Sequence, residues 1–209
     1  MRAALCLLSL AALSAPAAAH PSLVRVEAAR PDGVRFQGYP LPRASEGLGV
    51  TTAAREVTTA AHLVWGAQRI AVIAGDGTRL PARIERIDAG IDAALLAVAR
   101  PLRPQATLRV RPVQAGEALT AFAGSDAAAP LAGRALAPRW TSHALAVPLI
   151  LTDIKGAKGA SGGGLFDARG QLVGIVIRID RTLGYLSALP AEALCNVLAR
   201  CALAQDESQ

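Results

Sequence analysis

The sequence is poor in aromatic residues, histidine and cysteine, and each shortage narrows the range of functions. Aromatic residues make up 3% of the 209 positions, whereas proteins that bind single-stranded nucleic acid rely on aromatic side chains that stack on bases. The three histidines and three cysteines form no cluster at the spacing of a zinc site, and no Gly-Lys-Ser/Thr sequence is present to cradle a phosphate. The formal charge of +6 therefore indicates solvated arginines, with acidic partners as the minor alternative.

The first 19 residues have the pattern of a secretory signal peptide. Arg2 precedes an apolar run over residues 3–15, and small residues at 17–19 form a cleavage site of the A-x-A kind. The run is shorter than the roughly 20 residues of a membrane span; an uncleaved anchor or a buried helix is the alternative. We expect cleavage after Ala19, no later membrane span, and a bacterial protein that is periplasmic or secreted.

The cysteines leave two possibilities open. Cys6 is lost with the signal peptide, which leaves Cys195 and Cys201. An oxidising compartment permits a disulfide between them, but a continuous helix would hold positions six apart too far from each other for a bridge. A disulfide therefore requires the helix to end before Cys201, and two free thiols are the alternative.

Most of the remaining chain is typical of short strands separated by tight turns, which predicts an all-β fold of the sandwich or barrel type. A Pro-rich stretch around residues 101–112 is interpreted as the joint between two halves. The clear helical pattern is at residues 190–204, where Pro190 suits a first helical position. Hairpins are expected where a glycine-containing turn joins residues 22–28 to 34–39, 68–74 to 79–87, and 165–167 to 171–179.

Three residues could act together in catalysis. His62 ends a β-prone run, and Asp92 opens an apolar run, where a buried carboxylate could orient an imidazole; a helix cap is the plainer interpretation of Asp92. Asp88 is the rival carboxylate, on the polar side of the same turn. Ser161 lies among glycines, which let backbone N–H groups converge into an oxyanion hole. The strand pattern that follows directly indicates a structured turn rather than a flexible loop.

The order of these residues along the chain separates the hydrolase classes. A Gly-x-Ser-x-Gly elbow of the α/β-hydrolase type needs a histidine after its serine, and none follows Ser161. The subtilisin order would require Asp32, which lies in a tight turn. The order His62, Asp92, Ser161 is that of a trypsin-like triad.

A family pattern is found in five blocks that follow one another along the chain: residues 47–50, 57–64, 88–98, 115–119 and 159–174. These blocks resemble the trypsin-like serine proteases, most closely their Deg/HtrA branch. The resemblance implies two six-stranded antiparallel β-barrels with the site in the cleft between them, and here a C-terminal helix follows. We expect the N-terminal barrel over residues 20–104 and the C-terminal barrel with the helix over residues 105–209.

The resemblance also implies roles for the site residues. Ser161 would be the nucleophile, His62 the general base and then the acid, and Asp92 the residue that orients His62. The backbone N–H groups of Gly159 and Ser161 would form the oxyanion hole. The expected function is an exported serine endopeptidase that cleaves protein or peptide substrates through an acyl-enzyme, with no metal and no cofactor. The alternative is a catalytically inactive relative that serves as a binding or scaffold protein of the cell envelope.

Several positions depart from the family pattern. Ala160 stands where trypsins carry an aspartate that pairs with a freed amino terminus, so that route of activation is not expected. Gly164 replaces a usual proline, and no PDZ domain is recognisable. Lys155, six residues before the nucleophile, is a candidate for the base of the substrate pocket, where it would favour an acidic side chain; a lysine pointing to solvent is the alternative. Nothing in the sequence indicates an oligomeric state.

Overall fold

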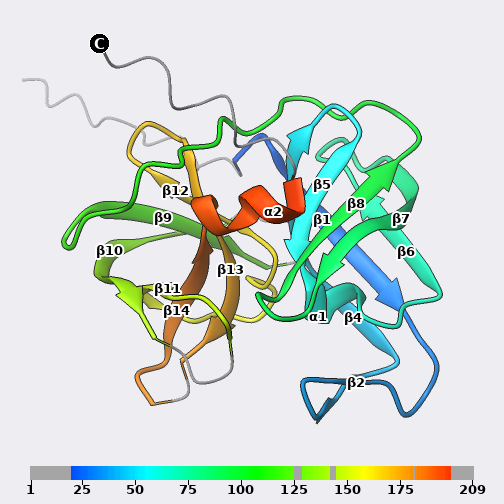
Figure 1. Ribbon diagram of the computed structural model, residues 1–209. Coiled ribbons are helices and arrows are strands. Elements are labelled where there is room, and N and C mark those ends of the chain that lie inside the picture. The colour runs from blue at the N-terminus through cyan, green and yellow to red at the C-terminus, as the bar shows by residue number, and fades with distance from the viewer. Residues whose placement is uncertain (1–19, 125–128, 142–144, 181, 199–209) are drawn as a thin grey trace, which may run out of the picture.

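The computed structural model describes residues 20–124, 129–141, 145–180 and 182–198, and it contains two closed, six-stranded antiparallel barrels side by side (Figure 1). This confirms the all-β double barrel expected from the sequence. The first barrel consists of β1 (Leu23–Ala29), β4 (Ala44–Ala53), β5 (Glu56–Ala60), β6 (Arg69–Ile73), β7 (Arg79–Asp88) and β8 (Ala93–Val98). The second consists of β9 (Ala118–Ala123), β10 (Ala129–Trp140), β11 (Leu149–Lys155), β12 (Gly164–Asp167), β13 (Leu172–Ile179) and β14 (Tyr185–Pro190).

Most residues of the central strands are buried, as a closed and packed barrel requires. In β8 five of six residues are buried, and in β13 six of eight are buried, because these strands lie between two neighbours and face the packed interior. Closing each sheet on itself pairs every strand edge, which removes the unpaired N–H and C=O groups that an open edge would present.

Two of the three expected hairpins are confirmed, and the first is wrong. β6 pairs with β7, and β12 pairs with β13, around the predicted turns. β1, however, pairs with β4 and β6. Residues 34–39 therefore do not pair with it; instead β2 (Arg35–Phe36) and β3 (Tyr39–Pro40) form a small hairpin of their own. Barrel closure requires both edges of β1, and the ten-residue β4 offers a longer ladder than residues 34–39 could.

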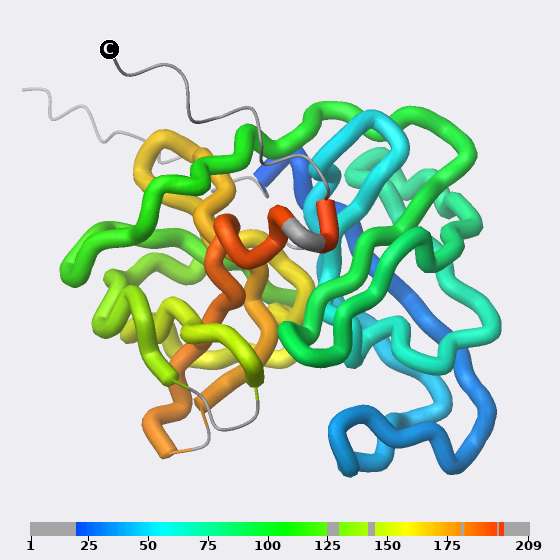
Figure 2. Tube along the Cα trace, viewed as in Figure 1, coloured from blue at the N-terminus to red at the C-terminus, as the bar shows by residue number. Residues whose placement is uncertain are grey.

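A long connection and a C-terminal helical segment join the barrels. The chain between β8 and β9 crosses from one barrel to the other over the surface (Figure 2). After β14, the 3-10 helix η1 (Ala191–Leu194) contacts β13 and β14, and the helix α2 (Cys195–Leu198) returns to the first barrel and contacts β7 and β8. Leu194 and Leu198 are buried in one apolar cluster with first-barrel residues, so this segment closes the interface between the barrels.

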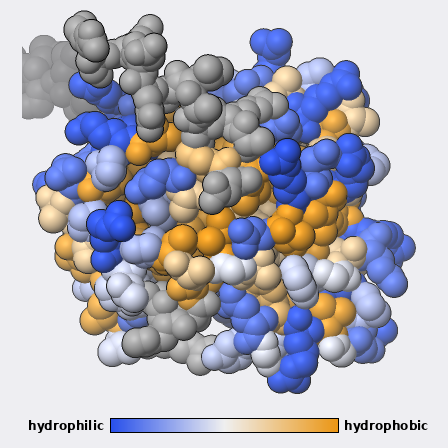
Figure 3. Space-filling view, viewed as in Figure 1, coloured by the Kyte–Doolittle hydropathy of each residue, from blue (hydrophilic) through white to orange (hydrophobic). Residues whose placement is uncertain are grey.

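The helix predicted over residues 190–204 is found as η1 and α2, and residues 199–204 lie outside the described residues. Cys195 is disulfide-bonded, whereas Cys201 and the expected signal peptide also lie outside the described residues. Within the part of the chain that the structure describes, no helix has the length and apolar character to cross a membrane. On the face shown in Figure 3, hydrophilic side chains dominate the periphery and hydrophobic ones gather nearer the middle.

Candidate active site

The pairing of β5 with β8 brings His62 and Asp92 together. Ala60 lies opposite Ala93 at the end of this ladder, and the single-turn helix α1 (Ala61–Val64) begins directly after β5. His62 Nδ1 lies 2.8 Å from Asp92 Oδ2, and the His62 backbone N–H donates to Asp92 Oδ1 over 2.9 Å. The Asp92 side chain is 5% exposed and that of His62 is 24% exposed. The carboxylate is therefore enclosed, while the imidazole reaches solvent.

The backbone of Asp92 is also specialised. Its φ of +59° is in the left-handed region, which few residues other than glycine adopt without strain, although aspartate does so more readily than most. The Asp92 carbonyl accepts a hydrogen bond of 3.1 Å from the N–H of Ala61, so main chain and side chain both hold α1. Asp88 instead accepts from the N–H of Gly90 in its own turn, over 2.8 Å. The structure thus places Asp92, and not Asp88, against the imidazole.

Ser161 lies on a second-barrel loop that reaches across to the first barrel. The N–H of Leu48, in β4, donates to the Ser161 carbonyl over 2.8 Å. Gly162 follows with a φ of +79°, and a Cβ added there would lie 2.1 Å from the carbonyl oxygen of Leu48. The N–H of Gly162 donates to Val176 of β13 over 2.7 Å, so the loop is fixed to both barrels. Only a glycine can occupy this position without displacing β4.

The hydroxyl and the backbone N–H groups at Ser161 are free to bind a ligand. Among the described residues, the Ser161 hydroxyl has no hydrogen-bond partner, and the N–H groups of Gly159 and Ser161 have no acceptor. Gly159 has a φ of +82° and lies close to Gly124, since an added Cβ would be 3.2 Å from the Gly124 nitrogen. Unpaired N–H groups beside a serine can stabilise a negative oxygen. Catalytic hydrogen bonds are often long without substrate and tighten in its presence.

The β2–β3 hairpin places an aromatic ring beside His62, a contact that sequence analysis missed. The Phe36 ring lies 6.3 Å from the imidazole and 5.4 Å from the Trp65 ring, between ring centroids. Gln37 donates from its side chain to the carbonyl of Ala89 over 2.8 Å, which ties the hairpin to the turn that precedes Asp92. No local pattern could reveal this contact, because it depends on where the hairpin folds.

Lys155 lies at the end of β11 with an exposed side chain, and its ammonium is 4.4 Å from the centre of the Tyr185 ring. This is a cation–π distance.

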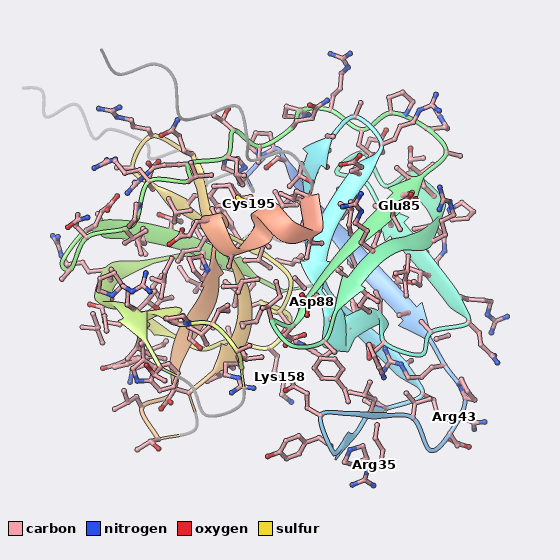
Figure 4. All side chains as sticks on the ribbon, in the orientation of Figure 1. Arg35, Arg43, Glu85, Asp88, Lys158 and Cys195 are labelled. Carbon is pink, nitrogen blue, oxygen red and sulfur yellow. The ribbon has the colours of Figure 1, made fainter. Side chains whose placement is uncertain are left out.

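Figure 4 shows Lys158, from the loop before Ser161, and Asp88, from the first barrel, near the boundary between the barrels. Within the described residues, no group of three or more His, Cys, Asp or Glu side chains is placed to hold a metal ion.

The sequence also matches known proteins. Residues 47–175 match the trypsin-like peptidase domain, a range that contains His62, Asp92 and Ser161. The chain belongs to this family. A protein of Halomonas elongata named "Probable periplasmic serine endoprotease DegP-like" is 31% identical over 170 residues, which cover 77% of this chain and 36% of that protein. The chain thus spans about a third of the length of this Deg/HtrA homologue.

Solved structures show the same fold. The HtrA-type protease AlgW, determined with a tripeptide, superposes with a TM-score of 0.73 at 24% identity, covering 87% of this chain and 60% of that one. The active form of the Rv3671c protease from M. tuberculosis superposes with a TM-score of 0.70 at 24% identity, covering 88% of this chain and 82% of that one. This member of the trypsin-like peptidase family therefore has an HtrA-type protease fold.

Proposed function

We propose that this trypsin-like peptidase is an exported serine endopeptidase that hydrolyses peptide bonds through an acyl-enzyme, with His62, Asp92 and Ser161 as its triad. The observation that carries the proposal is the two-point contact of Asp92 with His62, at 2.8 and 2.9 Å, combined with the Ser161 loop that Leu48 holds against the same barrel. Acyl transfer requires an imidazole fixed by a carboxylate and a serine hydroxyl that this imidazole can reach. Among the described residues, the Ser161 hydroxyl has no hydrogen-bond partner that would compete with His62.

The mechanism follows from these positions. Ser161 Oγ attacks the substrate carbonyl while His62 Nε2 accepts its proton, and the N–H groups of Gly159 and Ser161 stabilise the oxyanion. Asp92 keeps the proton of the imidazole on Nδ1 and stabilises the imidazolium. The tetrahedral species collapses, His62 protonates the leaving amine, and the acyl group stays on Ser161. A water molecule, deprotonated by His62, then releases the acid and restores the serine.

Labelling with a fluorophosphonate tests the activity, because the probe phosphonylates an activated serine. We expect the wild-type chain to be labelled and the Ser161→Ala variant to remain unlabelled. Labelling of both proteins would place the reactive group elsewhere. Labelling of neither would support the alternative, a trypsin-fold binding or scaffold protein of the cell envelope.

Substrate choice rests on Lys155 in this proposal. Its ammonium is exposed and close to Tyr185, from where it would favour an acidic side chain before the scissile bond. Cleavage of a peptide library by wild type and Lys155→Ala is the test. We expect a preference for Asp or Glu in the wild type that the variant loses, and absence of that preference in the wild type would refute the assignment.

Export to the periplasm or the medium, after cleavage at Ala19, is the proposed location. The disulfide at Cys195 is consistent with an oxidising compartment, and the Halomonas relative is named as periplasmic. We propose Cys201 as the partner of Cys195, because the only other cysteine, Cys6, is in the signal peptide. Amino-terminal sequencing of the exported protein is expected to begin at His20, and peptide mapping under non-reducing conditions to join Cys195 to Cys201.

A further inference from the structure

Arg30, directly after β1, is a buried cation without an acidic partner among the described residues. It is 5% exposed, and burial lowers its pKa, although an arginine keeps its charge in proteins. Its guanidinium donates to the carbonyl of Pro42 over 2.9 Å and to the hydroxyl of Ser45 over 2.7 Å. It also donates to the carbonyl of Leu63. Three neutral oxygens therefore take the place of a carboxylate.

Burying the charge of Arg30 among neutral acceptors lowers the stability of the fold. Removing a charged group from water carries a large penalty that hydrogen bonds to neutral acceptors offset only in part. Arg30 Nε is buried with no hydrogen-bond partner among the described residues, so even the donors of the guanidinium group are incompletely used. An apolar side chain of similar size would fill the same space without these costs, which points to a purpose beyond packing.

The purpose is indicated by Leu63, the residue after His62. Leu63 lies near the end of α1, where carbonyl groups have no helical N–H partner, and Arg30 supplies the missing donor. The Leu63 side chain points to the nucleophile loop: an added Cβ would lie 2.6 Å from Leu63 Cδ1 at Gly47 and 3.0 Å from it at Gly162. Leu63 therefore touches the residue after Ser161 and is bonded covalently to His62.

We propose that Arg30 is a positioning residue, which fixes Leu63 and thereby holds His62 in register with the Ser161 loop. This inference rests on the proposed function, because it concerns the alignment of the base with the nucleophile. A purely structural Arg30 would change the temperature of unfolding but not the chemical rate of protein that remains folded. A positioning Arg30 changes the chemical rate well below that temperature.

The test compares Arg30→Met and Arg30→Lys with a control, Arg43→Met. Arg43 lies on the same connection between β1 and β4, but its side chain is 76% exposed and paired with Asp32 at the outer edge of the barrel (Figure 4). The maximal rate of inactivation by a fluorophosphonate and the concentration for half-maximal rate are measured on folded protein. We expect Arg30→Met to lower the maximal rate by about ten- to a hundredfold, since small misplacements of reacting groups cost this much. The half-maximal concentration should change by less than about twofold, because the binding surface is unaltered.

Rescue by the conservative variant sharpens the result. Lysine keeps the charge and can reach the Leu63 carbonyl, but it lacks the fork that serves three acceptors at once. Arg30→Lys should therefore recover part of the rate that Arg30→Met loses, and Arg43→Met should match wild type. Should Arg30→Met fail to fold, Ser45→Ala, which removes one acceptor of the same guanidinium, is expected to lower the maximal rate by a few fold. Equal maximal rates in wild type and the folded Arg30 and Ser45 variants would overturn the inference.

A second readout separates this inference from the proposed function. The His62 Nδ1–H proton, held by Asp92, is expected as a low-field proton resonance at low temperature in wild type and in Arg43→Met. In Arg30→Lys it should shift or broaden because the imidazole is less firmly held. If wild type does not react with the probe, the proposed function fails, and this resonance still decides the role of Arg30. An unchanged resonance in the Arg30 variants would contradict the positioning role.

Discussion

The N–H of Leu48 donates a hydrogen bond of 2.8 Å to the carbonyl of Ser161 and so connects the two barrels at the proposed nucleophile. The carbonyl of Leu48 accepts from the hydroxyl of Thr59 over 2.6 Å, and Thr59 lies in β5, three residues before His62. The backbone of one β4 residue is therefore linked to the Ser161 loop and to the strand that leads to His62. Two separately closed barrels could otherwise move relative to each other, and this link opposes such a movement at Ser161.

Gly162→Ala is expected to disrupt this link. Both this variant and its control, Gly77→Ala, pay the left-handed backbone penalty of about 1–2 kcal/mol, because their φ values are +79° and +81°. Only at Gly162 does the new methyl group meet a backbone oxygen, that of Leu48 at 2.1 Å, whereas nothing lies within 4 Å at Gly77. Overpacking of this kind typically costs about 1–3 kcal/mol more.

Urea unfolding and fluorophosphonate labelling of the two glycine variants provide the check. Gly162→Ala should be the less stable variant and should label far more slowly than wild type. Gly77→Ala should lose stability but should be labelled at the rate of the wild type. If the two variants lost equal stability and equal labelling rate, the close approach of Leu48 to the Ser161 loop would have no energetic consequence.

Asp92→Asn tests the partner of the imidazole. An amide can present its NH₂ group to His62 Nδ1 and stabilise the wrong tautomer, which in serine proteases costs about 10⁴-fold in turnover. Asparagine tolerates the φ of +59°, so the variant should fold. Asp88→Asn is the matched control, because Asp88 contacts its own turn at Gly90. Comparable labelling rates for Asp92→Asn and wild type would contradict the assigned role.

The sequence predicts which side chains are candidates for the site, but it does not predict the contacts that the main chain makes. The sequence predicts His62, Asp92 and Ser161 as a triad because few residue types suit those roles and their order is distinctive. The structure brings His62 and Asp92 together, and the catalytic roles stay a prediction. The contacts of Leu48 and Leu63 use backbone groups that every residue has, and only the flanking glycines at 47 and 162 hinted at a close approach. Residues 34–39 were assigned the wrong partner because a turn signal reports a reversal of the chain and not which strands the barrel finally pairs.

His20, just before β1, contacts residues of the second barrel. Its ring stacks on Phe166 of β12 with 3.8 Å between centroids, Nε2 is 3.3 Å from the carbonyl of Gly170, and Nδ1 is 2.9 Å from the hydroxyl of Ser22. Burial lowers the pKa of His20 below the ordinary 6.5, with the Gly170 carbonyl acting in the opposite direction. The neutral ring is therefore favoured in the folded state.

The sign of the resulting pH dependence is defined by this shift. Above pH 6.5 His20 is neutral in both states and its contribution to stability is complete. Below that pH the unfolded chain gains a proton before the folded one does, so the free energy of unfolding decreases. We expect the unfolding temperature to fall less steeply between pH 7.5 and 5.5 in His20→Gln than in wild type. Parallel curves for the two proteins would show that His20 is not the source.

Arg109 joins the connection between the barrels to the second barrel through a buried ion cluster. Its side chain, 8% exposed, donates to Asp167 Oδ2 over 2.9 Å and makes a two-point contact with the carboxylate of Glu117. The hydrogen bond from Arg109 lowers the pKa of Glu117 from 4.5 to about 2. Burial opposes ionisation of Asp167, but hydrogen bonds from Arg109 and from two backbone N–H groups still lower its pKa. Both carboxylates are thus charged wherever the protein is near neutral pH.

Glu117→Gln removes one charge from this cluster and should destabilise the protein by about 1.5–3 kcal/mol at pH 7, the usual value of a hydrogen bond to a charged group. Because the folded pKa of Glu117 is depressed, its contribution is complete above pH 4.5 and is lost as the pH falls toward 2. The difference in urea unfolding between wild type and Glu117→Gln should therefore shrink from pH 6 to pH 3. Glu85→Gln is the control, since its pair with Arg83 is exposed, at 42% and 72% of the two side chains, and such pairs contribute about 0–1 kcal/mol. A difference for Glu117→Gln that stays constant with pH would mean that packing, and not the charge on Glu117, holds Arg109 in place.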